Sequence, residues 1–163
     1  MASEHYPRRQ KEGILSAISV GFFFVLVGII FIITPNLVDK TVNFFKDITS
    51  VNVANLPSNI FLPKPASVNA HTAVYSAAQQ FSVVWAIFLV AMLVLRFAAG
   101  SPMRNKAENL GDIVYWFGSA YLIQTWLIGR SEWFEFWALT LVLLGISLIV
   151  RAVFLAAAYA AKK

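Results

Sequence analysis

Four apolar runs, each long enough to cross a lipid bilayer, constrain this chain more than any other feature of its sequence. They cover residues 14–34, 72–97, 110–129 and 132–155, and each carries few charged residues. About 20 helical residues, rising about 1.5 Å each, cross the hydrocarbon core of a bilayer. A chain that is 59% hydrophobic and 13% charged also lies outside the range of soluble domains. We expect an all-α integral membrane protein with a four-helix antiparallel transmembrane bundle.

The third run differs from the others because polar residues lie near both of its ends. Asp112 lies near its start and Gln124 lies near its end. A Gly-Ser-Pro sequence at 100–102 breaks the preceding run, and serine before proline is a common beginning for a helix. We therefore expect the third helix to begin near Pro102 and to end at Gly129.

The segment 35–71, between the first two runs, is predicted to form a small extracytoplasmic cap. Thr34 followed by proline has the form of a helix start. Residues 37–48 have apolar side chains on one helical side and charged ones on the other. Such a helix lies on the membrane surface or covers the ends of other helices, and both interpretations stay open. Residues 51–62 hold two short apolar pieces around a turn signal at 55–59, which predicts an irregular or hairpin segment.

The distribution of basic residues predicts the orientation of the chain. If both termini are cytoplasmic, the inner segments carry nine of the thirteen Lys and Arg residues and four of the eight acids. The outer segments then carry four of each, so the whole net charge of +5 lies inside. Cytoplasmic flanks of membrane helices carry such an excess. We expect one membrane domain, 1–163, in the cell membrane, with cytoplasmic segments at 1–13, 98–109 and 156–163.

Three charged residues near the inner ends of the helices are predicted to form a clamp, meaning an ion pair that holds neighbouring helices together. Asp112 lies about one turn inside the third helix, and Arg96 and Arg151 leave the second and fourth helices at the same side. A lone carboxylate at the bilayer centre costs about 2.5 to 3.5 kcal/mol, and less near the interface, so pairing is expected. A proton or ion relay is the alternative interpretation.

Four polar side chains in the outer half of the bundle form a candidate polar membrane cluster. They are Gln79, Gln80, Gln124 and Glu135. Amides at this depth join helices by hydrogen bonds of about 0.6 kcal/mol each, and this is the interpretation that we favour. Amides that line a pore or a polar ligand site are the alternative.

Small residues on the first helix form a candidate helix-packing face. Ala17, Gly21 and Gly28 repeat at i, i+4 and i+11, which places them on one side of the helix. Small side chains allow the backbone of a neighbouring helix to approach closely in lipid. We expect a partner helix on this face, either from the same chain or from another one.

The chain lacks the residues that several classes of function require. The chain has no cysteine, which excludes disulfides and thiolate metal sites. No second histidine, cysteine or carboxylate lies at metal-ligand spacing from His71, so we expect the His71 side chain to be solvated. No carboxylate pair inside the membrane, serine-histidine pair or phosphate-binding glycine loop is present. We expect no catalysis, no cofactor and no metal, and no nucleic acid as a partner, because orientation explains the positive charge.

These features together favour a protein that acts by association within the membrane. We expect a structural or interaction component, either an accessory subunit of a larger membrane complex or a homo-oligomer. Its partners would be membrane lipid and further protein subunits or copies of itself. A small channel or transporter that uses the outer-half amides is the alternative, and a lipid-modifying membrane enzyme is a third hypothesis.

Overall fold

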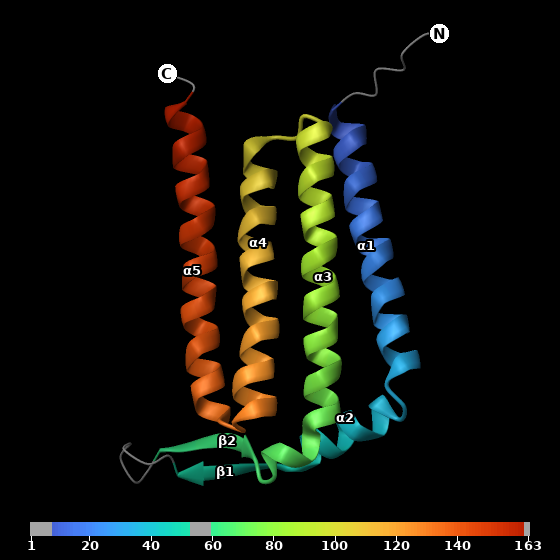
Figure 1. The fold of residues 1–163 in the computed structure, drawn as a ribbon, viewed down its shortest axis with the longest axis vertical. Helices are drawn as coiled ribbons and strands as arrows, with labels where there is room; N and C mark the ends of the chain where they lie inside the picture. The colour runs from blue at the N-terminus through green and yellow to red at the C-terminus, as the bar shows by residue number, and fades with distance from the viewer. Residues whose placement is uncertain (1–7, 53–59, 162–163) are drawn as a thin grey trace.

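The computed structural model describes the backbone of residues 8–52 and 60–161 and the side chains from residue 12 onward. The chain is mostly helical. In order, its elements are α1 (Arg8–Ile33), α2 (Leu37–Lys46), β1 (Ile48–Asn52), β2 (Phe61–Pro65), a 3-10 helix η1 (Val68–His71), α3 (Thr72–Ala98), α4 (Met103–Leu122), a π-helix η2 (Ile123–Gly129) and α5 (Trp133–Ala160). The four long helices stand side by side, and α2 and the strands lie across one of their ends (Figure 1).

Three of the described helices are long and apolar enough to cross a membrane. They are Glu12–Ile33, Val68–Ala98 and Trp133–Ala160. The run 110–129, which we predicted as a fourth span, is not among them. It lies in α4 and η2, and the first half of α4 brings charged side chains such as Arg104 and Glu108 into the same helix. Two helices also extend beyond their predicted bounds: α1 begins within the expected N-terminal tail, and α5 continues into the segment 156–163.

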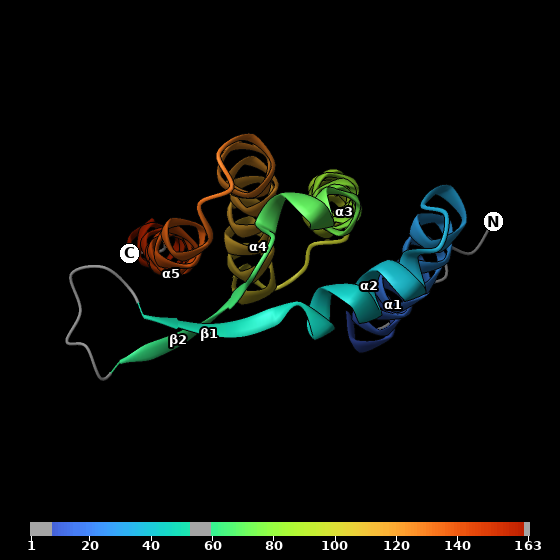
Figure 2. The same ribbon diagram turned by 90° about the horizontal axis from the view of Figure 1, so that it is seen from below.

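We predicted a four-helix antiparallel bundle, and the four long helices lie in an open row in the order α1, α3, α4, α5 (Figures 1 and 2). Among the described residues, α3 and α5 both pack on α4 but have little contact with each other. They pack on opposite sides of α4, because the residues that face them lie two positions apart. Asn109 contacts α3 and Gly111 contacts α5, and two positions in a helix are separated by about 200°.

The contact between α3 and α4 is the most extensive in the molecule. Ser82, Ala86 and Leu89 lie on one side of α3 at helical spacing, and all three are buried. Asn109, also buried, donates a hydrogen bond of 2.9 Å from Nδ2 to the carbonyl oxygen of Leu89. This bond satisfies an amide that would be costly to bury without a partner. It fixes the register of α4 against α3.

The helices α4 and α5 approach closely at two glycines. A Cβ atom added to Gly111 would lie 2.9 Å from the backbone oxygen of Ser147. One added to Gly118, seven residues later on the same side of α4, would clash with the side-chain end of Leu143. Small residues at such contacts let helix backbones approach in lipid. The glycines that meet another helix among the described residues are therefore on α4.

The first helix packs mainly on α3. Aromatic rings carry part of this contact: Phe22 stacks on Phe88 with ring centroids 4.0 Å apart, and Phe23 meets Phe81 edge-on at 5.9 Å. Aromatic pairs in such arrangements contribute about 0.5 to 1.5 kcal/mol beyond their buried area. The opposite side of α1 has no neighbour within the described residues.

A turn directs the chain from α1 into α2. Asn36 has φ 56°, a left-handed conformation that asparagine adopts more readily than most residues. The helix α2 therefore begins at Leu37, later than the sequence Thr34-Pro35 predicted. Leu37 is buried, whereas Val38 and Phe45 are exposed. One apolar side of α2 thus packs on the long helices, and a second apolar strip is left uncovered.

The strands β1 and β2 form an antiparallel ribbon that crosses the ends of the long helices (Figure 2). Val51 pairs with Leu62, and Asn52 pairs with Phe61. These pairs lie where the two apolar pieces of the predicted hairpin place them. The turn signal at 55–59 lies outside the described residues.

Candidate functional site

Asp47, at the end of α2, joins α2 and the segment after the ribbon to the start of α3. Its Oδ2 accepts a hydrogen bond of 2.9 Å from the backbone N–H of Ser67 and lies 2.8 Å from Nε2 of His71. Its carbonyl oxygen accepts a bond of 2.9 Å from the N–H of Ala66. Phe44 meets the His71 ring edge-on, with centroids 5.2 Å apart. These contacts fasten α2 and the ribbon to the long helices.

The placement of His71 corrects our expectation that this side chain is solvated. His71 is buried, with 8% of its surface exposed, and it pairs with Asp47. A buried imidazole needs a hydrogen-bond partner, and the carboxylate at the end of the amphipathic helix supplies it. Within the described residues, no group of three His, Cys, Asp or Glu side chains could hold a metal ion.

We predict that acid loosens the contact between α2 and α3. The hydrogen bonds from Ser67 and His71 lower the pKa of Asp47 from its ordinary value, although partial burial opposes them. Because the pKa of Asp47 is lower in the folded chain than in the unfolded chain, the ionised carboxylate stabilises the fold at pH values above the unfolded-state pKa. This stabilisation is lost as the pH falls through the folded pKa, below about 4. Near-ultraviolet circular dichroism should therefore show a transition in this range.

The variant Asp47→Asn should lack this transition, because its side chain does not titrate. Asp39→Asn is the matched control, since Asp39 is an exposed acid on the same helix. An acid transition that persists unchanged in Asp47→Asn would show that another group is responsible.

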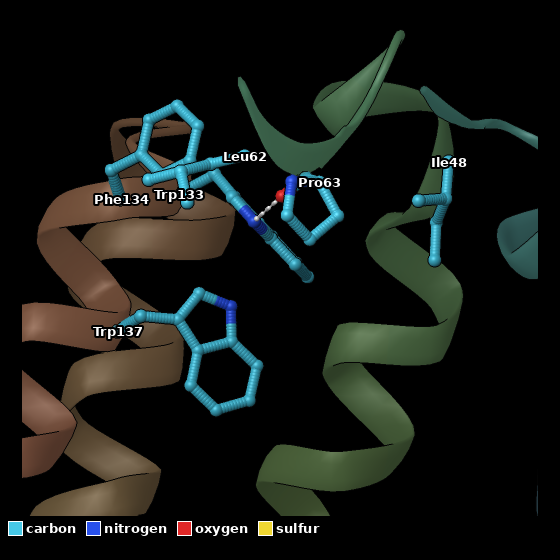
Figure 3. Close-up of a pocket in the computed structure, with 6 residues that line it drawn as sticks. All are labelled: Ile48, Leu62, Pro63, Trp133, Phe134 and Trp137. Carbon is cyan, nitrogen blue, oxygen red and sulfur yellow. Dashed lines mark hydrogen bonds between the residues drawn. The ribbon is translucent and has the colours of Figure 1, made fainter. Parts of the chain in front are cut away.

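An apolar recess lies between the ribbon and the start of α5 (Figure 3). Its volume is about 380 Å³, and it is lined by Ile48, Leu62, Pro63, Trp133, Phe134 and Trp137. Trp133 donates a hydrogen bond of 3.0 Å from Nε1 to the carbonyl oxygen of Pro63. Tryptophan is typical of the level where a helix enters a bilayer. The recess thus lies where the ribbon meets the predicted outer surface of the membrane.

A second pocket, of about 250 Å³, lies between α3, α4 with η2, and α5. We call it the aromatic pocket. Five aromatic side chains line it: Phe81, Tyr115, Trp116, Phe136 and Trp137. Three hydroxyl side chains line it as well: Ser82, Ser119 and Thr140. Trp137 also lines the apolar recess, so the two cavities adjoin.

At the other end of the helices, the structure brings together two of the three residues of the predicted clamp. Arg151 donates a hydrogen bond of 3.0 Å from Nη2 to Oδ1 of Asp112. Arg96 instead donates from Nη1 to the carbonyl oxygen of Asn105. Asn105 lies in the first turn of α4, which follows α3 after a short turn, so the hydrogen bond of Arg96 goes to this turn. The ion pair Asp112–Arg151 therefore links α4 to α5.

Two further polar contacts at this end were not predicted. Asn105 donates a hydrogen bond of 2.9 Å from Nδ2 to Oε2 of Glu12, which connects α4 to α1. The Nζ atom of Lys106 lies 4.4 Å from the centroid of the Phe97 ring, at a distance typical of a cation–π contact. Charged residues that we used only to assign orientation thus also join helices.

The four side chains of the candidate polar membrane cluster are placed separately. Gln80, Gln124 and Glu135 are exposed, and Gln79 is partly buried. Gln80 lines a groove between α1 and α3 that none of the other three lines. Within the part of the chain that the structure describes, no hydrogen bond joins any two of them. Adjacent residues such as Gln79 and Gln80 point about 100° apart in a helix, which keeps them from sharing one site.

The candidate helix-packing face of α1 lies on the side opposite α3. Leu26 and Ile30 are buried against α3, whereas Ala17, Gly21 and Gly28 are exposed. A Cβ atom added to Gly21 or Gly28 would have no atom within 4 Å. The face therefore has no partner among the described residues of the chain.

Comparison with known proteins adds no assignment. The chain matches no protein-family model, no curated protein and no solved structure.

Proposed function

We propose that the protein is an integral membrane protein that acts through lateral association with a second protein helix. The uncovered face of α1 carries this proposal. Its glycines have open space around them, while phenylalanines on the other side of the helix pack on α3. Exposed glycine lowers helix stability by about 1 kcal/mol relative to alanine, and a close helix contact explains its use. A second copy of the chain or a subunit of a larger membrane complex would cover this face.

The open row of helices supports the same proposal. The helices at its two ends, α1 and α5, each pack on only one long neighbour among the described residues. The side chain of Asp112 remains 49% exposed beside Arg151. A charged side chain at membrane depth is normally directed towards protein or water. A partner that packs beside the row would reduce the contact of the Asp112 side chain with lipid.

Transport has less support than association. A channel or transporter would need the amide side chains to line one polar path together. Gln80 instead lines a groove that the other side chains of the candidate polar membrane cluster do not line. An enzyme would need a catalytic group of side chains, and neither the aromatic pocket nor the apolar recess is lined by a charged side chain.

Association can be tested in the native membrane. The tagged protein should be cross-linked before solubilisation and then purified, and its mass should exceed that of one chain. A parallel measurement of mass in lipid nanodiscs would distinguish copies of itself from another subunit. A strictly monomeric protein that captures no partner in either measurement would remove the proposal.

We further propose that α2 and the ribbon lie outside the cell and that α4 begins in the cytoplasm, with four membrane spans. This cysteine-free chain permits a direct test with single cysteines. Thr49 in β1 and Pro102 before α4 are both exposed. A membrane-impermeant maleimide should label Thr49→Cys in intact cells and label Pro102→Cys only after the membrane is opened. The opposite pattern would invert the topology.

A further inference from the structure

One polar group in the lining of the aromatic pocket has no hydrogen-bond partner among the described residues. The hydroxyl groups of Ser82 and Thr140 donate hydrogen bonds of 2.8 Å to the carbonyl oxygens four residues earlier, Ala78 and Phe136. The Oγ atom of Ser119 is buried and, within the part of the chain that the structure describes, has no hydrogen-bond partner; the residue is only 9% exposed. A buried donor without a partner is unfavourable. Ser119 therefore brings to the pocket wall a hydroxyl whose hydrogen bond is not used by the described residues.

The surroundings of Ser119 define what could accept this hydrogen bond. The five aromatic rings of the pocket, which come from three helices, offer flat apolar surfaces. A cavity of about 150 Å³ is enough to bind benzene, so a volume of about 250 Å³ accommodates a substituted ring. The adjoining recess, lined only by Ile48, Leu62, proline and aromatic side chains, offers room for an apolar tail.

We propose that the aromatic pocket binds a lipid-soluble molecule whose ring carries a carbonyl oxygen, such as a quinone. The Ser119 hydroxyl donates to this oxygen, the ring lies against Trp116 and Trp137, and the tail passes Trp137 into the recess. A fatty acyl chain would fill the same space but has no acceptor for Ser119. This site is separate from the uncovered face of α1, so it does not depend on the proposed association.

The proposal can be tested with the full-length protein in nanodiscs. The probe is decyl-1,4-benzoquinone, whose ring quenches tryptophan fluorescence when it lies against Trp116 or Trp137. Because the probe also dissolves in the bilayer, unspecific quenching should rise in proportion to its concentration. Binding in the pocket should add a component that saturates. An excess of decylbenzene, which has the ring and the tail but no carbonyl, should displace the probe only weakly.

Two variants examine the pocket, and one serves as a control. Ser119→Ala should weaken saturable binding about 3- to 10-fold, which is the usual effect of losing one hydrogen bond. Ala78→Leu should abolish saturable binding, because Ala78 is exposed at the pocket wall and the added atoms would fill the cavity. Ala91→Leu makes the same change at an exposed position of α3 outside the pocket and should bind as the wild type does.

Two results would overturn the proposal. Quenching that rises linearly and equally in all four proteins would show that the quinone only dissolves in the bilayer. Saturable binding of equal strength in the wild type and Ser119→Ala, or equal displacement by decylbenzene, would show that the site does not recognise a carbonyl. Circular dichroism and elution volume should be the same for all four proteins, which makes these comparisons direct.

Discussion

Gly111→Ala should lower the free energy of unfolding, because an overpacked contact costs about 1–3 kcal/mol. The new Cβ atom would lie 2.9 Å from the backbone oxygen of Ser147 and 3.3 Å from Nε of Arg151. A backbone oxygen cannot rotate away as a side chain does, so α4 and α5 must separate. Separation would also draw Arg151 away from Asp112, whose ion pair lies next to this contact. The higher helix propensity of alanine, about 1 kcal/mol, offsets only part of this loss.

Two other glycines provide matched controls for this measurement. Gly145 on α5 has no atom within 4 Å of an added Cβ, so Gly145→Ala should be neutral or stabilising. At Gly118 the added atom meets the flexible end of Leu143, which can move, so the loss should be smaller than at Gly111. Unfolding in lipid bicelles, followed by circular dichroism, would rank the three variants. Equal stability of Gly111→Ala and Gly145→Ala would contradict the described approach of α4 to α5.

The helices were predictable because length and hydropathy alone determine where a membrane helix can form. The predicted runs 72–97 and 132–155 agree with α3 and α5 to within a few residues at most ends. Their arrangement was not predictable in the same way. An apolar helix surface packs equally well on lipid and on protein, because hydrophobicity gives no net drive between helices in a bilayer. The sequence therefore did not distinguish an open row from a closed bundle.

The polar contacts were predictable only where two charges lie at the same depth. Asp112 and Arg151 could be paired because both lie near the inner ends of their runs. Arg96 has a similar depth, and only the turn after α3 directs it to Asn105. The pair of Asp47 with His71 depends on how α2 returns beneath α3, and no spacing along the chain indicates this return. Helix spacing did contain the signal for Gly111 and Gly118, which lie seven residues apart, but not the identity of the helix that meets them.

Gly21→Leu should weaken association between chains about 5- to 150-fold while leaving the single chain intact. The large side chain would prevent close approach of a partner helix, and an overpacked contact costs about 1–3 kcal/mol, or about 10-fold in affinity for each 1.4 kcal/mol. Within one chain the same side chain meets open space, because no atom lies within 4 Å of the added Cβ. The monomer should therefore keep its stability, or gain some from the better helix propensity of leucine. The fraction of dimer across a dilution series in lipid would measure the effect.

The chain offers a matched control that separates an effect of the face from an effect of added bulk. Gly145→Leu places the same side chain at another glycine with open space, on α5 at the far end of the row (Figure 1). If the face of α1 is the contact, Gly145→Leu should associate as the wild type does, and Gly28→Leu should behave as Gly21→Leu does. If all three variants associate normally, the glycines of α1 face lipid. If Gly145→Leu alone dissociates, the contact lies at the α5 end of the row. A loss of association in Gly21→Leu and Gly28→Leu alone would place the partner helix on the side of α1 opposite α3.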